Sequence, residues 1–365
     1  KADTGTATDD TSLTLTWTLT DKPGRSALVD SSLGGAATDT VTFTPDTGGR
    51  YVLQLAASDG TFTGTDTVQV VVAGDLTVPG DYASVGEAFD VLVSGHSITL
   101  EAGLYPANLD LNGKDLTLIG AGSTATVLDA EGASSVIRAT AGESLTLTDL
   151  ALTGGVANEG GGLHLAANAA LIPTASLTRV TVSDNLAVDG GGIFCDGGTL
   201  VATDLWITDN VAIYAGGGLL ADNCSTKVTR LGLFGNLAEV SFGGGLHAIA
   251  SVIDITNAQI GYNHGKKGGA FSLLSASDLL LSFATLVGNT ADDCGAVVCV
   301  TDGDIAIDNG IIAHNGEASG PDVLGQTTGA TVTWSPTYTL FWDNLPTLSS
   351  THPNATGGTG NLTVD

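Results

Sequence analysis

The stretches that decide the fold are six phrases in the second half of the chain, each ending in Asn: VSDN (182–185), ITDN (207–210), LFGN (233–236), IGYN (260–263), LVGN (286–289) and IAHN (312–315). Their last residues, Asn185, Asn210, Asn236, Asn263, Asn289 and Asn315, are separated by 25, 26, 27, 26 and 26 residues. Before each phrase, apolar residues alternate with others, which is typical of a strand with one buried face. A repeat of this length without a helical pattern predicts a stacked β-solenoid.

A second series of residues runs in step with the asparagines. It consists of glycine pairs followed by Leu, Ile or Ala: Gly161–Gly162, Gly191–Gly192, Gly217–Gly218, Gly244–Gly245 and Gly268–Gly269, continued by Cys294–Gly295–Ala296. We expect a bend at each Asn, which tolerates a left-handed backbone, and another at each glycine pair. Stacked about 4.8 Å apart, the Asn amides can also bond along the axis. A parallel β-helix is expected, right-handed because parallel crossovers nearly always are.

The same pattern sets the limits of the solenoid. Leu150, Leu152 and Gly155 take the places of Val180, Val182 and Asn185 one coil earlier, and residues 97–103 and 115–122 read as the first strands. Ser84 and Glu87 form a capping box for a short amphipathic helix, which would cap the open end. Residues 331–344 predict one more coil. The β-helix is therefore expected over 75–345, followed by an extended Gly/Thr-rich tail over 346–365.

These motifs resemble known families. The Gly-Gly-[Ala/Ile/Leu] and aliphatic-x-x-Asn repeats are similar to those of polymorphic outer-membrane proteins and related bacterial β-helix surface proteins. The segment 81–122 resembles the entry to pectin-lyase-like β-helices. The resemblance covers about residues 76–345 and implies the fold, which hosts enzymes, adhesins and scaffolds alike.

The first 74 residues have a different pattern of short alternating strands at 13–19, 40–45, 51–58 and 66–72. This spacing predicts a β-sandwich. Trp17 is expected in its core, and Tyr51 is placed like a corner tyrosine. The phrase from Tyr51 to Gly60 resembles PKD or related Ig-like modules of bacterial exoproteins. Such modules have a strand before the tryptophan strand that is missing here, so we expect the module to be either incomplete at its start or completed by a strand from elsewhere.

Composition limits the partners. The formal net charge is −28, with 39 acidic and 11 basic residues, which argues against nucleic acid and anionic membrane surfaces. There is no transmembrane run. We expect an extracellular or bacterial cell-surface protein without a required cofactor. Cys195 and Cys224 fall in adjacent coils and could form a disulfide, whereas Cys294 and Cys299 would need a bend between them.

Two patterns are candidates for chemistry. Asp292 and Asp293 in NTADDCG resemble the aspartate pair of polygalacturonases, although no Gly-His-Gly follows them. Lys266 and Lys267 could remove a proton from an acidic sugar, as lysines do in β-helix lyases. For both patterns we favour a solvated turn. Asp302, Asp304 and Asp308 could bind Ca²⁺, but TDGDIAID lacks a complete loop signature.

A column beside the glycine series is the candidate binding face. It comprises His164, Phe194, Leu220, His247, Phe271 and Val297. If the preceding residue of each coil points inward, alternation sends this column outward, where its apolar character would mark a contact surface. Trp206 also falls on an outward position, where an aromatic ring can stack on sugars or partner chains.

The sequence therefore predicts a non-catalytic surface or extracellular scaffold that binds surface glycans or proteins. The alternative is a secreted polysaccharide lyase or glycoside hydrolase acting on acidic glycans. A further expectation is head-to-tail self-assembly into a filament, in which Lys1–Asp10 or Asn361–Asp365 is donated as a strand to another copy.

Overall fold

The structure is a computed structural model that describes residues 13–168, 170–316, 321–344 and 362–364. No helix in these ranges is long and apolar enough to cross a membrane. The chain divides into two compact units, Lys1–Glu101 and Ala102–Asp365, which are described separately below. The domain boundary expected at residues 74 and 75 lies inside the first unit, between two of its strands, and remains a prediction.

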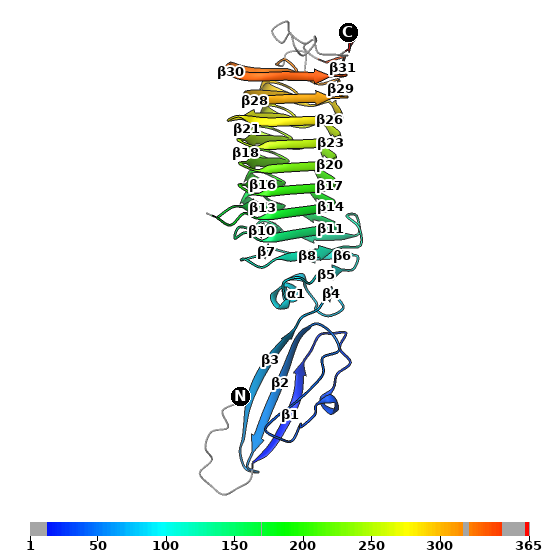
Figure 1. The fold of residues 1–365 in the computed structure, drawn as a ribbon, viewed down its shortest axis with the longest axis vertical. Helices are drawn as coiled ribbons and strands as arrows, with labels where there is room; N and C mark the ends of the chain where they lie inside the picture. Colours follow the sequence, from blue (N-terminus) through cyan, green and yellow to red (C-terminus); the bar gives the residue numbers. More distant parts are fainter. Residues whose placement is uncertain (1–12, 169, 317–320, 345–361, 365) are drawn as a thin grey trace. The chain divides into compact units, whose positions relative to one another are not determined.

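The first unit contains a three-stranded antiparallel sheet of β1 (Thr14–Asp21), β2 (Gly49–Ser58) and β3 (Thr63–Val72), with β2 in the centre (Figure 1). A short 3₁₀ helix, η1 (Asp30–Ser32), lies in the segment between β1 and β2. Trp17 belongs to the core as expected, together with Leu33, Leu53 and Leu55. The core therefore forms on one face of the sheet.

The prediction of a strand at 40–45 is wrong. This segment forms only an isolated bridge, between Gly34 and Thr42. Val41 and Phe43 nevertheless pack against the core, so their alternation reflects side-chain packing without a strand ladder. The second sheet of an Ig-like sandwich thus remains a prediction.

Tyr51 is fully buried at the start of β2. Its hydroxyl lies 3.0 Å from the carbonyl oxygen of Thr47, four residues upstream, and 3.0 Å from Oδ1 of Asp46. This is the backbone contact of a corner tyrosine, as expected from the sequence.

The rest of the first unit is formed by β4 (Leu76–Val78), α1 (Val85–Val91) and β5 (Ile98–Leu100). The predicted capping box is confirmed. Ser84 Oγ accepts from Glu87 N at 3.2 Å, and Ser84 N donates to Glu87 Oε2 at 3.3 Å. The helix buries Val85, Ala88 and Phe89. Its role as a solenoid cap remains a prediction.

The second unit is a parallel β-helix, as predicted, in which every coil pairs with the next (Figure 1). It opens with β6 (Gly103–Pro106), β7 (Leu109–Asp110), β8 (Leu116–Ile119) and β9 (Thr126–Asp129). The long strands that follow stack as β11 (Ser144–Thr153), β14 (Thr174–Ser183), β17 (Thr199–Thr208), β20 (Ser225–Phe234), β23 (Val252–Gly261) and β26 (Ser277–Val287). The last strands are β29 (Ile311–Ala313), β30 (Leu324–Thr337), β31 (Leu340–Trp342) and β32 (Leu362–Val364).

Two further strand stacks complete each coil. One contains β10 (Ile137–Ala139), β13 (Leu163–Ala166), β16 (Ile193–Asp196), β19 (Leu219–Asp222), β22 (Leu246–Ile249), β25 (Phe271–Leu274) and β28 (Val298–Asp308). The other contains β12 (Val156–Glu159), β15 (Leu186–Asp189), β18 (Val211–Ala215), β21 (Leu237–Phe242), β24 (His264–Lys267) and β27 (Thr290–Cys294). The predicted register is confirmed where Leu150 pairs with Val180 and Leu152 with Val182.

The six repeated asparagines form one continuous buried ladder. Asn236 shows the pattern: its Oδ1 accepts from the backbone N and Nδ2 of Asn210, and its Nδ2 donates to Asn263 Oδ1 and Ile207 O. Within the described residues the ladder continues to a seventh asparagine, Asn344, whose Oδ1 accepts from Asn315 Nδ2 at 3.1 Å. The axial amide bonding expected from the sequence is thus confirmed, and it includes the coil predicted at 331–344.

The bend itself is not where the sequence suggested. The left-handed residue is the one before each Asn, as at Asp184 (φ 56°), Asp209 (φ 56°) and Tyr262 (φ 57°). None of the six asparagines has a positive φ. Asn is therefore required for its amide, which satisfies backbone groups on the neighbouring coil, and the preceding residue takes the turn.

Candidate functional site

The predicted contact stripe stacks in register over β13, β16, β19 and β22, as His164, Phe194, Leu220 and His247. Phe194 is half-buried, and the other three are buried. The expectation of an exposed stripe is therefore wrong. Alternation directs these side chains away from the solenoid core, but Phe242 of the same coil covers His247, and the ring of Phe194 contacts His164 of the neighbouring coil.

Phe271 and Val297 do not belong to this column. Phe271 pairs with Leu246, on the inner face, and is fully buried, while Ser272 pairs with His247. The left-handed turn residue explains the error, because Gly243 (φ 62°) is matched by Gly268 (φ 77°). The pair Gly268–Gly269 therefore lies one residue out of step with Gly244–Gly245, and a one-residue slip moves a side chain to the opposite face.

For His247 the covering residue lies five positions earlier in the chain, across the glycine turn. Phe242 stacks on His247 with ring centroids 5.1 Å apart, and the Nζ of Lys267 lies 5.4 Å from the Phe242 ring. At the same positions two coils further, Cys294 and Cys299 form a disulfide. The left-handed turn at Gly295 supplies the bend that this bridge needs.

At one end of this corner the column opens into a groove lined by Ser134, Arg138, Asn158, Glu159 and His164. Among the residues that the structure describes, Nε2 of His164 has no hydrogen-bond partner, and Glu159 Oε2 is 3.4 Å away. Burial, with the charge of Arg138, lowers the pKa of His164 to about 4. Burial likewise lowers the pKa of His247 to about 4. Both imidazoles are therefore neutral at pH 7.

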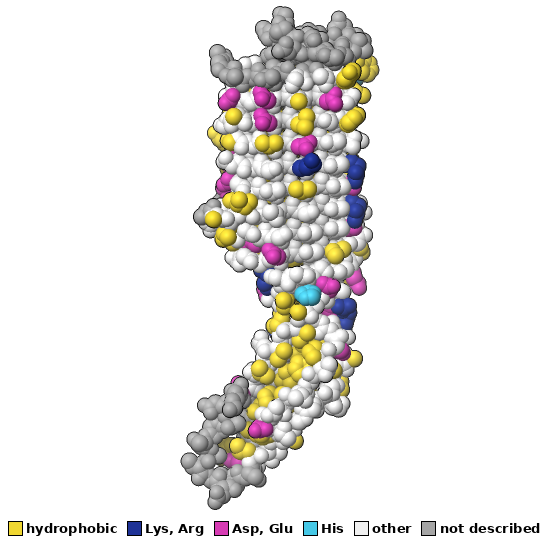
Figure 2. Space-filling model, in the orientation of Figure 1, with side chains coloured by type: hydrophobic (Ala, Val, Ile, Leu, Met, Phe, Trp, Pro, Cys, Tyr) yellow, Lys and Arg dark blue, Asp and Glu magenta, His cyan; other side chains and the backbone are white. Residues whose placement is uncertain are grey.

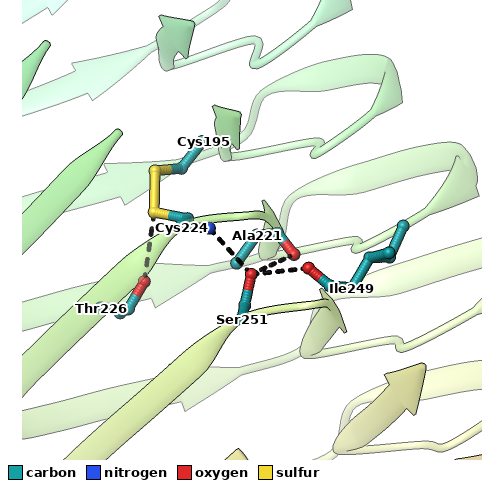
Figure 3. Close-up of a disulfide and its surroundings, with 6 residues drawn as sticks. All are labelled: Cys195, Ala221, Cys224, Thr226, Ile249 and Ser251. Atoms are coloured by element: carbon teal, nitrogen blue, oxygen red, sulfur yellow. Dashed lines mark hydrogen bonds between the residues drawn. A yellow bond between two sulfur atoms is a disulfide. The ribbon is translucent and has the colours of Figure 1, made fainter. Parts of the chain in front are cut away.

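The expected disulfide between Cys195 and Cys224 is present and joins adjacent coils (Figure 3). Cys224 N donates to Ser251 Oγ at 2.9 Å, and that hydroxyl lies 2.8 Å from Ile249 O. Both sulfurs belong to buried residues. This disulfide is therefore a buried covalent link between two adjacent coils.

The candidate catalytic residues meet on β24 and β27. Nζ of Lys266 lies 3.7 Å from Asp293 Oδ2, and Nε2 of His264 lies 3.7 Å from Asp292 Oδ1. Both aspartates and Lys266 are exposed. Each carboxylate thus faces a basic group of the adjacent coil in open solvent, which is the arrangement of weak surface ion pairs.

The Ca²⁺ candidates lie on one strand, β28, which pairs with β25 up to Val300 and with β26 from Gly303 onward. Asp304 and Asp308 are four residues apart on it, which places their Cα atoms about 13 Å from each other, too far to share one ion. Asp308 Oδ1 also accepts from Thr337 Oγ1. Across the described ranges, no three His, Cys, Asp or Glu side chains are grouped to hold a metal.

Sequence reasoning missed a charge ladder at a second left-handed position inside the long strands. Asp149 (φ 58°), Arg179 (φ 54°), Asp204 (φ 57°) and Arg230 (φ 63°) occupy it on successive coils. Arg179 Nη2 donates to Asp149 Oδ2 at 2.7 Å, and Arg230 Nη2 donates to Asp204 Oδ2 at 2.7 Å. These arginines lower the pKa of both carboxyl groups. The alternation of Asp and Arg at 25- to 30-residue steps was the available signal.

Searches against protein-family models and against curated proteins found no match. Among solved structures, the chain is similar to pectin methylesterase from Aspergillus niger (13% identity, TM-score 0.37, covering 80% of this chain and 90% of that one). It is also similar to carrot pectin methylesterase (13%, TM-score 0.34, 80% and 88%) and to a family 28 exopolygalacturonase from Yersinia enterocolitica (9%, TM-score 0.21, 83% and 85%). Similarity this low carries no argument about activity.

Proposed function

We propose that this chain is an extracellular, non-catalytic scaffold in which the β-helix acts as a rigid support for binding faces. The observation that carries the proposal is the pairing of Lys266 with Asp293 and of His264 with Asp292 in open solvent. A hydrolase or lyase needs groups whose acidity is tuned by burial and by a specific partner within a cleft. The candidates of this chain instead lie beside one another at the surface, Lys266 with Asp293 and His264 with Asp292.

The two disulfides support an extracellular location. Cys195–Cys224 and Cys294–Cys299 use all four cysteines of the chain. Structural disulfides persist in oxidising surroundings such as the cell exterior and are rare in the cytosol. An acidic surface with a net charge of −28 suits a protein that stays in solution there.

The test is incubation with pectate, alginate and chondroitin in the presence of Ca²⁺. Absorbance of unsaturated products reports a lyase, and a reducing-end assay reports a hydrolase. We expect no turnover above buffer. Turnover that Lys266→Ala or Asp293→Ala abolishes would establish the enzymatic alternative, and Asp278→Ala, an exposed aspartate of β26, is the matched control.

Self-association by strand addition is a second candidate, favoured by the edge of the first unit. Within the described residues, β3 pairs only with β2, whereas the other edge is partly covered where Trp17 N donates to Ala36 O. Val68 and Val71 of β3 are exposed, and Figure 2 shows hydrophobic side chains gathered over this sheet. An uncovered edge strand of this kind invites a strand from another chain.

Of the two donors considered, Lys1–Asp10 is the one we propose, although it lies outside the described residues. Between the undescribed Asn361 and Asp365, β32 pairs with β31 of the same chain. Electron microscopy and light scattering of the chain with and without Lys1–Asp10 test the idea. We expect filaments or oligomers that disappear on truncation, and a monodisperse monomer at high concentration would refute it.

A further inference from the structure

A shallow groove of about 410 Å³ lies on the outer surface of the long strands β17, β20, β23 and β26. Trp206 and Phe283 line it from the first and last of these strands, with side chains that are 45% and 57% exposed. Between them lie Gly232 and the exposed amide side chains of Asn257 and Gln259. Three coil steps of about 4.8 Å place the two aromatic strands about 14 Å apart, which is room for more than one sugar ring.

The indole of Trp206 is held in a fixed position. It lies over the next coil at Gly232, where an added Cβ would come within 2.2 Å of the Trp206 Cε3. It also stacks with Phe234, with ring centroids 6.1 Å apart and planes inclined by 18°. An exposed aromatic ring that is already immobilised offers an apolar platform at little further cost in side-chain entropy.

The charges around the groove are already neutralised. Arg230 lines it, but its Nε and Nη2 both donate to the carboxylate of Asp204. An anionic sugar would need a cation to hold its carboxylate, and among the described groove residues Arg230 is the only basic side chain. The groups left to recognise a ligand are the uncharged amides of Asn257 and Gln259 and the hydroxyl of Thr285.

Flat apolar platforms beside uncharged donors and acceptors match a chain of neutral sugars, whose rings have apolar faces and whose rims carry hydroxyl groups. We propose that this groove binds an uncharged polysaccharide, running along the solenoid axis from Trp206 to Phe283. The proposal rests on the proposed scaffold function and names the ligand class that the scaffold holds.

The test is binding of neutral hexasaccharides of glucose, mannose and N-acetylglucosamine, with hexagalacturonate as the acidic comparison. Titration calorimetry gives the affinity, and chromatography of the sugar afterwards reports any cleavage. We expect at least one neutral hexasaccharide to bind and to be recovered intact. Trp206→Ala and Phe283→Ala should each weaken binding about tenfold or more, whereas Trp206→Phe retains most of it.

The matched control is Tyr262→Ala. Tyr262 is 67% exposed on the same unit but does not line the groove, so this variant should bind like the parent protein. Circular dichroism of every variant checks that the coils remain folded. The proposal is overturned if no neutral hexasaccharide binds at millimolar concentration, if hexagalacturonate binds more tightly, or if Trp206→Ala leaves affinity unchanged. Cleavage of a bound neutral sugar would instead refute the non-catalytic function and leave the binding site standing.

Discussion

Replacing Asn236 by alanine removes four hydrogen bonds from the centre of the asparagine ladder. Two buried backbone groups lose partners: the N–H of Asn210 and the carbonyl oxygen of Ile207. Asn210 Nδ2 keeps its bond to Val182 O, and Asn263 Oδ1 keeps its bond from the backbone N of residue 236. Each buried polar group left without a partner costs about 1–3 kcal/mol, so the loss of both partners lowers the free energy of unfolding by about 2–6 kcal/mol.

Urea unfolding followed by circular dichroism measures the loss, and hydrogen exchange of the Asn210 amide localises it. Asn158→Ala is the matched control, because Asn158 is exposed and outside the ladder. If the free energy of unfolding falls no more for Asn236→Ala than for the control, the reasoning is refuted. It holds that Asn is required here for the hydrogen bonds of its side-chain amide and not for the geometry of the turn.

Asn236→Asp separates these two explanations further, since aspartate has nearly the same shape but cannot donate when ionised. Burial raises the pKa of such a carboxyl group in the folded state above its unfolded value near 3.9. The variant should therefore be closest to the parent below about pH 4 and lose stability as the pH rises. A stability difference that does not change between pH 4 and pH 7 would contradict this reasoning.

Two more predictions concern the cysteines and the buried imidazoles. Replacing both Cys195 and Cys224 by alanine should lower the free energy of unfolding by about 3.6 kcal/mol, because the bridge joins residues 29 apart; the same change at Cys294 and Cys299, 5 apart, should cost about 2 kcal/mol. Urea unfolding of the two double variants compares these losses in the free energy of unfolding, and a larger loss for the Cys294/Cys299 variant would contradict the prediction. His164 and His247, with pKa values near 4, stay neutral while the unfolded chain takes up protons below about pH 6.5. Stability should therefore be full above that pH and fall towards pH 4, and NMR titration midpoints near 6.5 for these two rings would contradict it.

The sequence predicted only part of the groove between Trp206 and Phe283. The position of Trp206 between inward-facing Leu205 and Ile207 followed from alternation, and its exposure is confirmed. Its partner across the groove, Phe283, was missed because it occupies a left-handed position where the alternation breaks. The candidate stripe failed for a different reason: alternation predicts which way His247 points, but not that Phe242 covers it from across the turn.

The sequence by itself determined the period of the coils, the ladder from Asn185 to Asn315, the capping box of α1 and the pairing of the long strands. Each of these features follows from a fixed spacing in the sequence, and coils of equal length can stack in few other ways. Only the tertiary structure decided that Phe271 faces inward and that Cys294 meets Cys299. Both depend on which glycine takes the left-handed turn, and the repeats allow two registers one residue apart. A slip of one residue preserves the repeat but exchanges inside and outside, so only packing against the neighbouring coils can choose between them.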